Sequence, residues 1–227
     1  MLSDFQRSKL DRRFELLDAD GDGHITAADY DAVAARLCQA FGFAEGSPQH
    51  EKVHVIQLRL WTALSRRMEA EDTGRISRRQ FAESCARSII EAEHGYDRII
   101  GPVAQTIFDL VDGDDSGTLE VEELTAWFNA YGVCADDAER AFKRLDRNGD
   151  GVLDLAEVEQ ALKEFYTSDD PAAPGNAIFG PLPVPAAVTM AAKPKPKPKA
   201  QTGAQPTPKP HASAHMNAKP KPATAKK

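Results

Sequence analysis

The sequence of 227 residues contains little of what several protein classes require. No apolar run approaches the roughly 18 residues that a membrane-spanning helix needs, which argues against an integral membrane protein. The first residues lack the basic-then-apolar layout of a secretory signal. The three cysteines, Cys38, Cys85 and Cys134, are too few and too widely spaced for a disulfide framework. We therefore expect a cytoplasmic protein whose cysteines are reduced and pack in the core.

Acidic residues are absent from the last quarter of the chain. From Pro171 to the end there is no Asp, Glu or Arg but there are nine lysines, whereas residues 1–170 hold all 35 acids against nineteen bases, a net charge of −16. Thirteen of the fifteen prolines also follow Ser168. Such a composition cannot bury enough apolar surface to offset chain entropy. We predict an acidic folded body, an extension packed on it at 171–185, and a disordered Lys/Pro/Ala-rich tail at 186–227.

Apolar residues recur at spacings of three and four throughout the body, which predicts an all-α fold. The eight expected helices span residues 5–17, 27–41, 53–68, 78–93, 103–111, 121–131, 135–145 and 155–165. These eight helices form four consecutive pairs, and the two helices of each pair are joined by a short loop rich in Asp and Gly. The body is therefore an internal repeat. We divide it into a first pair of hands at 1–95 and a second pair at 96–170, which together form one compact domain.

The repeated unit is a twelve-residue loop that occurs at residues 18–29, 69–80, 112–123 and 146–157. Oxygen-bearing side chains stand at positions 1, 3 and 5, glycine at 6, an aliphatic residue at 8, and in three loops a carboxylate at 12. Calcium needs six to eight oxygens at about 2.3–2.6 Å, and this spacing turns alternate side chains toward one ion while position 7 offers a backbone carbonyl. The pattern is that of the EF-hand loop. The predicted ligands are Asp18, Asp20, Asp22, His24, Asp29, Asp112, Asp114, Ser116, Thr118, Glu123, Asp146, Asn148, Asp150, Val152 and Glu157.

The four loops are not equivalent. Loops three and four have full ligand sets, so both should bind calcium. Loop one ends in Asp29, one methylene shorter than Glu, which favours a six-coordinate site that magnesium also accepts. Loop two has Glu69 and Glu71 where a shorter Asp is expected and a neutral Gln80 at position 12, so we expect it to bind nothing and to pair with loop one. About three calcium ions are therefore predicted, with loops three and four paired in the same way.

The central glycines of the loops are separated by 51, 43 and 34 residues, unlike the even spacing of calmodulin. With the silent second loop and the segment 168–180, residues 1–183 resemble the sarcoplasmic calcium-binding protein and calerythrin family. The resemblance implies a compact single domain, intracellular calcium binding at loops one, three and four, and a buffering role. It does not account for the tail.

Two functions remain open for such a body: a monomeric calcium buffer or signal modulator, or a calcium sensor that opens to bind an unknown target protein. The chain has four methionines, few for an adaptable groove, and Ile178 and Phe179 would fill such a groove themselves. The lysines of the tail either contact a polyanion or are simply solvated. We read no metal-ligand pattern in the six histidines and find no G-x-S-x-G or P-loop, so we predict that the chain is not an enzyme.

Overall fold

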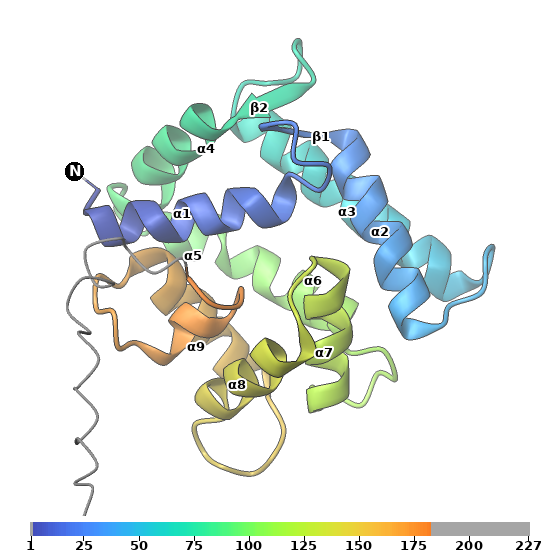
Figure 1. The fold of residues 1–227 in the computed structure, drawn as a ribbon. Coiled ribbons are helices and arrows are strands. Elements are labelled where there is room, and N and C mark those ends of the chain that lie inside the picture. The colour runs from blue at the N-terminus through green and yellow to red at the C-terminus, as the bar shows by residue number, and fades with distance from the viewer. Residues whose placement is uncertain (1, 183–227) are drawn as a thin grey trace, which may run out of the picture. The chain divides into compact units, whose positions relative to one another are not determined.

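The computed structural model describes residues 2–182 (Figure 1), so the tail predicted at 186–227 and the last residues of the extension lie outside the described residues. The regular secondary structure of the described chain is helical apart from two three-residue strands, which confirms the all-α class. Among its helices, none combines the length and the apolar character that crossing a bilayer requires. In chain order the elements are α1 Asp4–Leu17, β1 His24–Thr26, α2 Ala27–Phe41, α3 Pro48–Arg67, β2 Arg75–Ser77, α4 Arg78–Cys85, the π-helical turn η1 Ala86–Ile90, α5 Gly95–Ile99, α6 Gly101–Val111, α7 Val121–Ala130, α8 Ala135–Leu145, α9 Leu155–Thr167 and the 3₁₀ turn η2 Pro174–Ala177.

Several helices begin where the sequence provides a cap. The hydroxyl of Ser3 accepts a hydrogen bond from the backbone N–H of Gln6, and Asp154 accepts one from Glu157 at the start of α9. α3 begins at residue 48, five residues before the predicted start, because Ser47 caps it and Pro48 occupies its first turn. The residues of that first turn are polar, so they show no apolar periodicity from which a helix could be predicted.

The expected helix at 78–93 is too long. α4 ends at Cys85, a single π-helical turn follows, and the separate short helix α5 occupies 95–99. The chain bends at Gly95 because it passes against the preceding turn: a Cβ there would lie 2.5 Å from the carbonyl oxygen of Ser88 and 2.6 Å from that of Ile89. The boundary that we place between residues 95 and 96 falls inside α5.

The loops pair as the aliphatic residue at position 8 predicts. β1 and β2 are antiparallel, with Ile25 opposite Ile76, at the upper end of the molecule in Figure 1. Leu119 and Leu153 form the corresponding bridge between loops three and four, with N···O distances of 2.8 and 2.9 Å. All four side chains are at most 2% exposed, so each pair of loops is fixed to the core at its centre.

One hydrophobic core runs through both pairs of hands. α1 contacts α9 and α2 contacts α7, so the helices of the first pair pack on those of the second. Cys38 and Cys85 are buried in this core, as predicted, and burial raises the pKa of the Cys85 thiol to about 12. The prediction is wrong for Cys134, which is exposed: it is the residue before α8, and its thiol donates to the Asp137 carboxylate.

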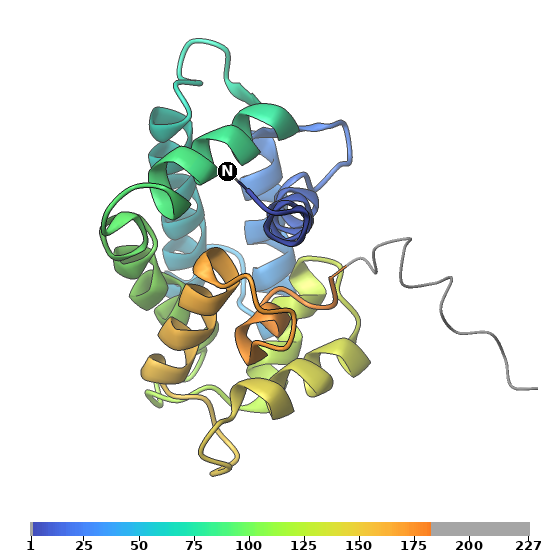
Figure 2. The ribbon, with the colours of Figure 1, turned by 90° about the vertical axis from the view of Figure 1, so that its left-hand side faces the viewer.

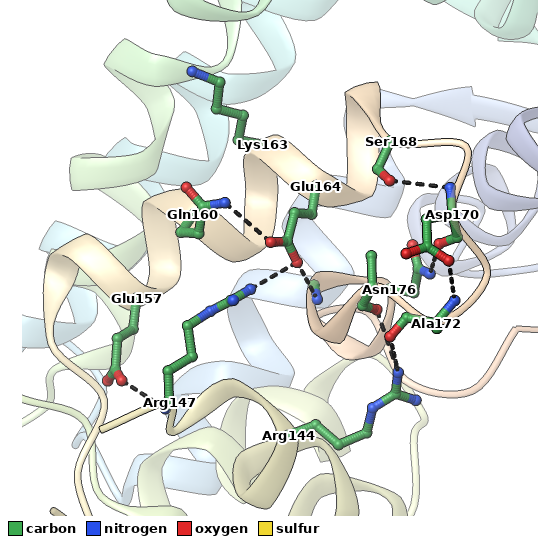
Figure 3. A network of polar contacts seen from close by, with 12 residues as sticks. Arg144, Arg147, Glu157, Gln160, Lys163, Glu164, Ser168, Asp170, Ala172 and Asn176 are labelled. Atoms are coloured by element: carbon green, nitrogen blue, oxygen red, sulfur yellow. Dashed lines mark hydrogen bonds and ion pairs between the residues drawn. The ribbon is translucent and has the colours of Figure 1, made fainter. Parts of the chain in front are cut away.

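After α9 the chain turns back and packs η2 against α8 and α9 (Figures 1 and 2). Figure 3 shows the polar contacts that hold it: the Glu164 carboxylate accepts hydrogen bonds from Gly175 N, Arg147 and Gln160 at 2.8, 2.7 and 3.0 Å. Burial raises the pKa of Glu164, but these hydrogen bonds outweigh it and the pKa lies below its usual value. The carboxylate is therefore held ionised beneath the extension.

Lys9 of α1 is joined to the same region although its side chain is almost fully buried. Its ammonium donates to the backbone carbonyls of Glu164 and Ser168 and to the side-chain oxygen of Asn176. Burial lowers the pKa of Lys9 to about 8, against the opposing effect of the negative charges of Asp169 and Glu164. The end of α9 and the extension are thus connected to the first helix of the chain.

Two apolar residues of the extension complete the core. Ile178 is fully buried and Phe179 is 3% exposed. The Phe179 ring lies edge-on to Phe165, with centroids 4.7 Å apart, and 6.0 Å from Trp127. The guanidinium of Arg13 lies 4.4 Å from the centroid of the same ring, a cation–π contact. The extension therefore covers a helical interface that would otherwise be open.

We predict that Gly175→Ala destabilises the body by about 1–3 kcal/mol, because an added Cβ would lie 2.4 Å from the Ala161 carbonyl and 2.7 Å from Glu164 Cβ. Gly101→Ala is the matched control: its Cβ would meet nothing nearer than 3.9 Å, so the variant should be as stable as the parent chain or slightly more so. Denaturant unfolding measures both. Equal midpoints for the two variants would contradict the close packing of the extension.

Candidate metal centres

Loops one, three and four orient their ligand side chains by a shared set of backbone hydrogen bonds that loop two lacks. In loops one, three and four the glycine at position 6 has a positive φ, between 83° and 88°, as the predicted sharp turn requires. Its N–H donates to the carboxylate at position 1, with N···O distances of 2.9, 2.9 and 3.1 Å to Asp18, Asp112 and Asp146. The first ligand of each loop is therefore turned inward by the loop itself.

The carboxylate at position 12 is fixed by the same three loops in a second way. In each it accepts the N–H of position 2: Ala19 N lies 2.9 Å from Asp29, Gly113 N 2.7 Å from Glu123, and Arg147 N 2.7 Å from Glu157. Its other oxygen accepts the N–H of position 9. The first residues of the exiting helix are thus tied to the start of the loop.

Loop one gathers three carboxylates at its centre. One oxygen each of Asp18, Asp20 and Asp22 lie within 4.8 Å of one another. The Oδ1 atom of Asp18 is buried and has no hydrogen-bond partner. Such an orphaned buried oxygen is costly unless it meets a cation. His24 lies in β1, where its N–H donates to Asp22, and Asp29 is only 3% exposed.

Loop three shows the same gathering with the position-12 residue included. Oxygens of Asp112, Asp114 and Glu123 lie within 4.8 Å of one another. Burial raises the pKa of Glu123, hydrogen bonds from Glu120 N and Gly113 N lower it, and the charges of Asp114 and Asp112 raise it further, with a net rise. Ser116 Oγ donates to the Thr118 carbonyl at 2.9 Å. The repulsion among these carboxylates is what a bound cation would relieve.

Loop four has the same backbone contacts, but its position-3 ligand is the amide Asn148 and not a carboxylate. Asn148 and Asp150 are hydrogen-bonded to each other, with Nδ2···Oδ2 at 2.8 Å, and Val152 N donates to Asp150. Both Asp146 oxygens accept loop N–H groups, from Gly149 and from position 6. Glu157 is 8% exposed. Loop four is not among the groups of the described residues whose acidic oxygens lie within 4.8 Å of one another.

Loop two differs from the other three loops at positions 1, 3 and 12. Glu69 has a left-handed backbone, with φ of 51°, and the Glu71 carboxylate lies 3.4 Å from Arg66. Thr73 Oγ1 donates to the Arg75 carbonyl, which is the position-7 oxygen, at 3.1 Å. Gln80 is exposed and its side chain caps α4 through Ser77 instead of reaching the loop's start. These contacts give loop two no converging negative charge.

A third group of ligand-type side chains lies outside the loops. Cys38, His50 and His54 also place one ligand atom each within 4.8 Å of one another. The sequence does carry a signal for it, since His50-Glu51-Lys52-Val53-His54 has the H-E-x-x-H spacing. Our reading that the histidines form no ligand pattern is therefore wrong for these two. The third member comes from another helix, which the spacing alone does not reveal.

Comparison with known proteins agrees with the arrangement of the hands. The EF-hand domain pair matches residues 103–162 and the EF hand matches residues 10–34. Calerythrin from Saccharopolyspora erythraea is 28% identical over 159 residues, which cover 70% of this chain and 90% of calerythrin.

Two solved structures show the same fold. The calcium-loaded apo form of the coelenterazine-binding protein from Renilla muelleri has a TM-score of 0.67 at 22% identity, covering 80% of this chain and all of that one. The sarcoplasmic calcium-binding protein from amphioxus has a TM-score of 0.61 at 18% identity, covering 81% and 100%. The repeated loops and the two family matches identify EF-hands in this chain, and over most of its length the chain is similar to calerythrin and to the sarcoplasmic calcium-binding protein.

Proposed function

We propose that this chain is a calcium buffer or signal modulator that holds one divalent cation in each of loops one, three and four. The observation that carries the proposal is the convergence of oxygens in loop one around the buried, unpartnered Asp18 Oδ1, together with the same backbone contacts in loops three and four. Carboxylate and carbonyl oxygens are the ligands that calcium and magnesium prefer. The proposed ligands are the fifteen residues that the loop pattern predicts.

Burial of the extension favours the buffer over the sensor. A sensor must expose an apolar groove when it binds calcium, whereas here Ile178 and Phe179 already occupy the space beside Trp127. A cavity of about 100 Å³ remains among apolar residues of both pairs, including Leu17, Phe81 and Trp127. That is far smaller than the groove a partner helix fills.

The remaining expectations belong to the same proposal. We propose a cytoplasmic location, because Cys38 and Cys85 are free thiols and a reducing compartment keeps thiols free. We also propose that the protein is a monomer. We assign it no enzymatic activity, and we leave contact of the lysine-rich tail with a polyanion as a secondary role. The target protein of a sensor, the alternative function, is unidentified.

Calorimetric titration of the metal-free protein should show three calcium ions per chain. Glu123→Gln and Glu157→Gln should each weaken one site by at least about tenfold, or about 1.4 kcal/mol, because each replaces a charged position-12 ligand by a neutral amide. Gln80→Ala in loop two is the control and should leave the titration unchanged. A fourth ion, or equal titrations for parent and both glutamate variants, would contradict the assignment of the loops.

Loop one should discriminate poorly between calcium and magnesium because its position-12 carboxylate is short. In a Glu123→Gln/Glu157→Gln background, where loops three and four are weakened and loop one fills first, Asp29→Glu should raise the ratio of calcium to magnesium affinity at loop one by about tenfold or more. Asp29→Asn, which removes the charge and keeps the length, should weaken both ions. Competition titrations measure the ratio, and an unchanged ratio in Asp29→Glu would show that side-chain length does not set the selectivity.

Dye binding distinguishes buffer from sensor. For a buffer, the fluorescence of an apolar-surface dye should not rise when calcium is added to the parent chain, because Phe179 keeps the interface covered. In the double variant Ile178→Ala/Phe179→Ala the dye fluorescence should rise on calcium addition, since the uncovered interface binds the dye. Leu58→Ala, at a side chain that is already exposed, is the control. A calcium-dependent rise in the parent chain would instead support the sensor.

A further inference from the structure

The group formed by Cys38, His50 and His54 has a chemistry unlike that of the loops. It offers one thiol and two imidazoles, with a ligand atom of each residue within 4.8 Å of the other two. Cys38 stands near the end of α2 and is 4% exposed, while both histidines lie in the first two turns of α3 and are half-buried. The group is therefore enclosed on one side by the core and open to solvent on the other.

Two rigid elements position these side chains. α2 and α3 pack along each other as a hairpin (Figure 1), with Tyr30 of α2 against Trp61 of α3 at 5.9 Å between ring centroids. His50 and His54 are four residues apart, so they share one face of α3, and their ring centroids are 4.6 Å apart. The hairpin brings that face to Cys38. Ligands on helices are held more firmly than ligands on loops.

A carboxylate accompanies one of the histidines. Asp31, two turns before Cys38 on α2, places its Oδ1 atom 3.1 Å from Nδ1 of His54. Histidines that ligate metals commonly donate their second ring nitrogen to a carboxylate, which fixes the orientation of the ring and makes it a stronger ligand. The contact supplies the outer partner that a bound histidine would need.

The spacing of the group is close to that of a tetrahedral site. Zinc–sulfur and zinc–nitrogen bonds of about 2.3 and 2.0 Å place neighbouring ligand atoms roughly 3.5 Å apart. All three ligand atoms lie within 4.8 Å of one another, so binding would require side-chain rotations that close the remaining gap of at most about 1 Å. The remaining corner is open to solvent on the exposed side of the histidines.

We propose that Cys38, His50 and His54 bind one zinc ion that joins α2 to α3, with Asp31 orienting His54. A thiolate and two imidazoles form a soft ligand set that selects zinc over calcium and magnesium, so the site is independent of the EF-hand loops. Zinc replaces the thiol proton, which is released to solvent.

The assignment is to binding and not to hydrolysis. In metalloproteases with the H-E-x-x-H spacing, the glutamate between the histidines acts as the general base. Here Glu51 is exposed, and the neighbouring Lys52 pairs with Asp115 of loop three at 3.4 Å. The zinc therefore acts as a link between two helices.

The test uses the full chain with its loops saturated with calcium, so that zinc cannot compete for them. Because zinc has no visible spectrum, cobalt(II) serves as the probe in absorption, followed by zinc in competition with a chromophoric chelator. A further background change, His211→Ala/His215→Ala, removes two histidines of the tail that have the same four-residue spacing. We expect one cobalt ion per chain, with a thiolate-to-metal charge-transfer band that zinc abolishes.

Single substitutions identify the ligands. His54→Ala, at a half-exposed position that leaves the core intact, should weaken zinc binding more than about 100-fold, and Asp31→Asn should weaken it about 10- to 100-fold. Cys38→Ser should remove the charge-transfer band. His94→Ala and Cys134→Ser are the matched controls, since both residues are exposed and lie outside the group. Each of these two variants should bind zinc as tightly as the parent chain does.

Three results would overturn the proposal: zinc binding as tight in His54→Ala as in the parent, a cobalt spectrum without the thiolate band, or a loss of that band in Cys134→Ser instead of Cys38→Ser. Circular dichroism of every variant separates loss of zinc from loss of fold. If Cys38→Ser does not fold, the persistence of the thiolate band in Cys134→Ser excludes the exposed cysteine as its source, and His50→Ala tests the second imidazole.

Discussion

The carboxylate at position 12 is the contact on which each functional hand depends. In loops one, three and four it lies in the exiting helix yet accepts N–H groups from positions 2 and 9 of the loop. The entering helix, the loop and the exiting helix are thereby closed into one unit whose charge is concentrated at its centre. A cation bound in that centre would stabilise the folded chain by an amount that grows with the logarithm of its concentration relative to Kd, because the unfolded chain has no such centre. In loop two the neutral Gln80 makes a helix cap only, and the unit is not closed.

Loop four is connected to the extension through a single residue. Arg147, at position 2, gives its N–H to Glu157 and its guanidinium to Glu164, and Glu164 in turn accepts the N–H of Gly175. Figure 3 shows this path from the loop to η2. The position-12 carboxylate and the C-terminal extension are therefore connected through Arg147, by its backbone on one side and by its guanidinium and Glu164 on the other. Any movement of α9 against its loop also shifts the support of Phe179, which covers Trp127 and Arg13. These contacts form a continuous route along which the proposed cation in loop four would act on the closure of the core.

The sequence predicted the loops well because their chemistry is local. Twelve consecutive residues contain the ligands, the turn glycine and the pairing residue, so spacing alone indicates the positive φ of Gly23 and the bridge between Leu119 and Leu153. Features that depend on contacts distant in sequence were not predictable in this way. α5 begins where Gly95 fits against the carbonyls of an earlier turn, and Lys9 is buried because it meets the end of α9 some 155 residues later. Neither contact leaves a periodic pattern.

The cysteine–histidine group lies between these two cases. The four-residue spacing of His50 and His54 can be read from the sequence. The proximity of Cys38 to them depends on the hairpin of α2 and α3 and cannot be read in that way. α2 thus carries the position-12 carboxylate of loop one at its start and a proposed zinc ligand near its end, with Asp31 between them. In sensor EF-hands the helices change their relative angle when calcium binds, whereas in buffers they barely do; a metal bound to both α2 and α3 would fix the angle between those two helices. If loop two binds no calcium, as we propose, a zinc ion at the hairpin would give the first pair a means of holding α3 in place that does not depend on calcium.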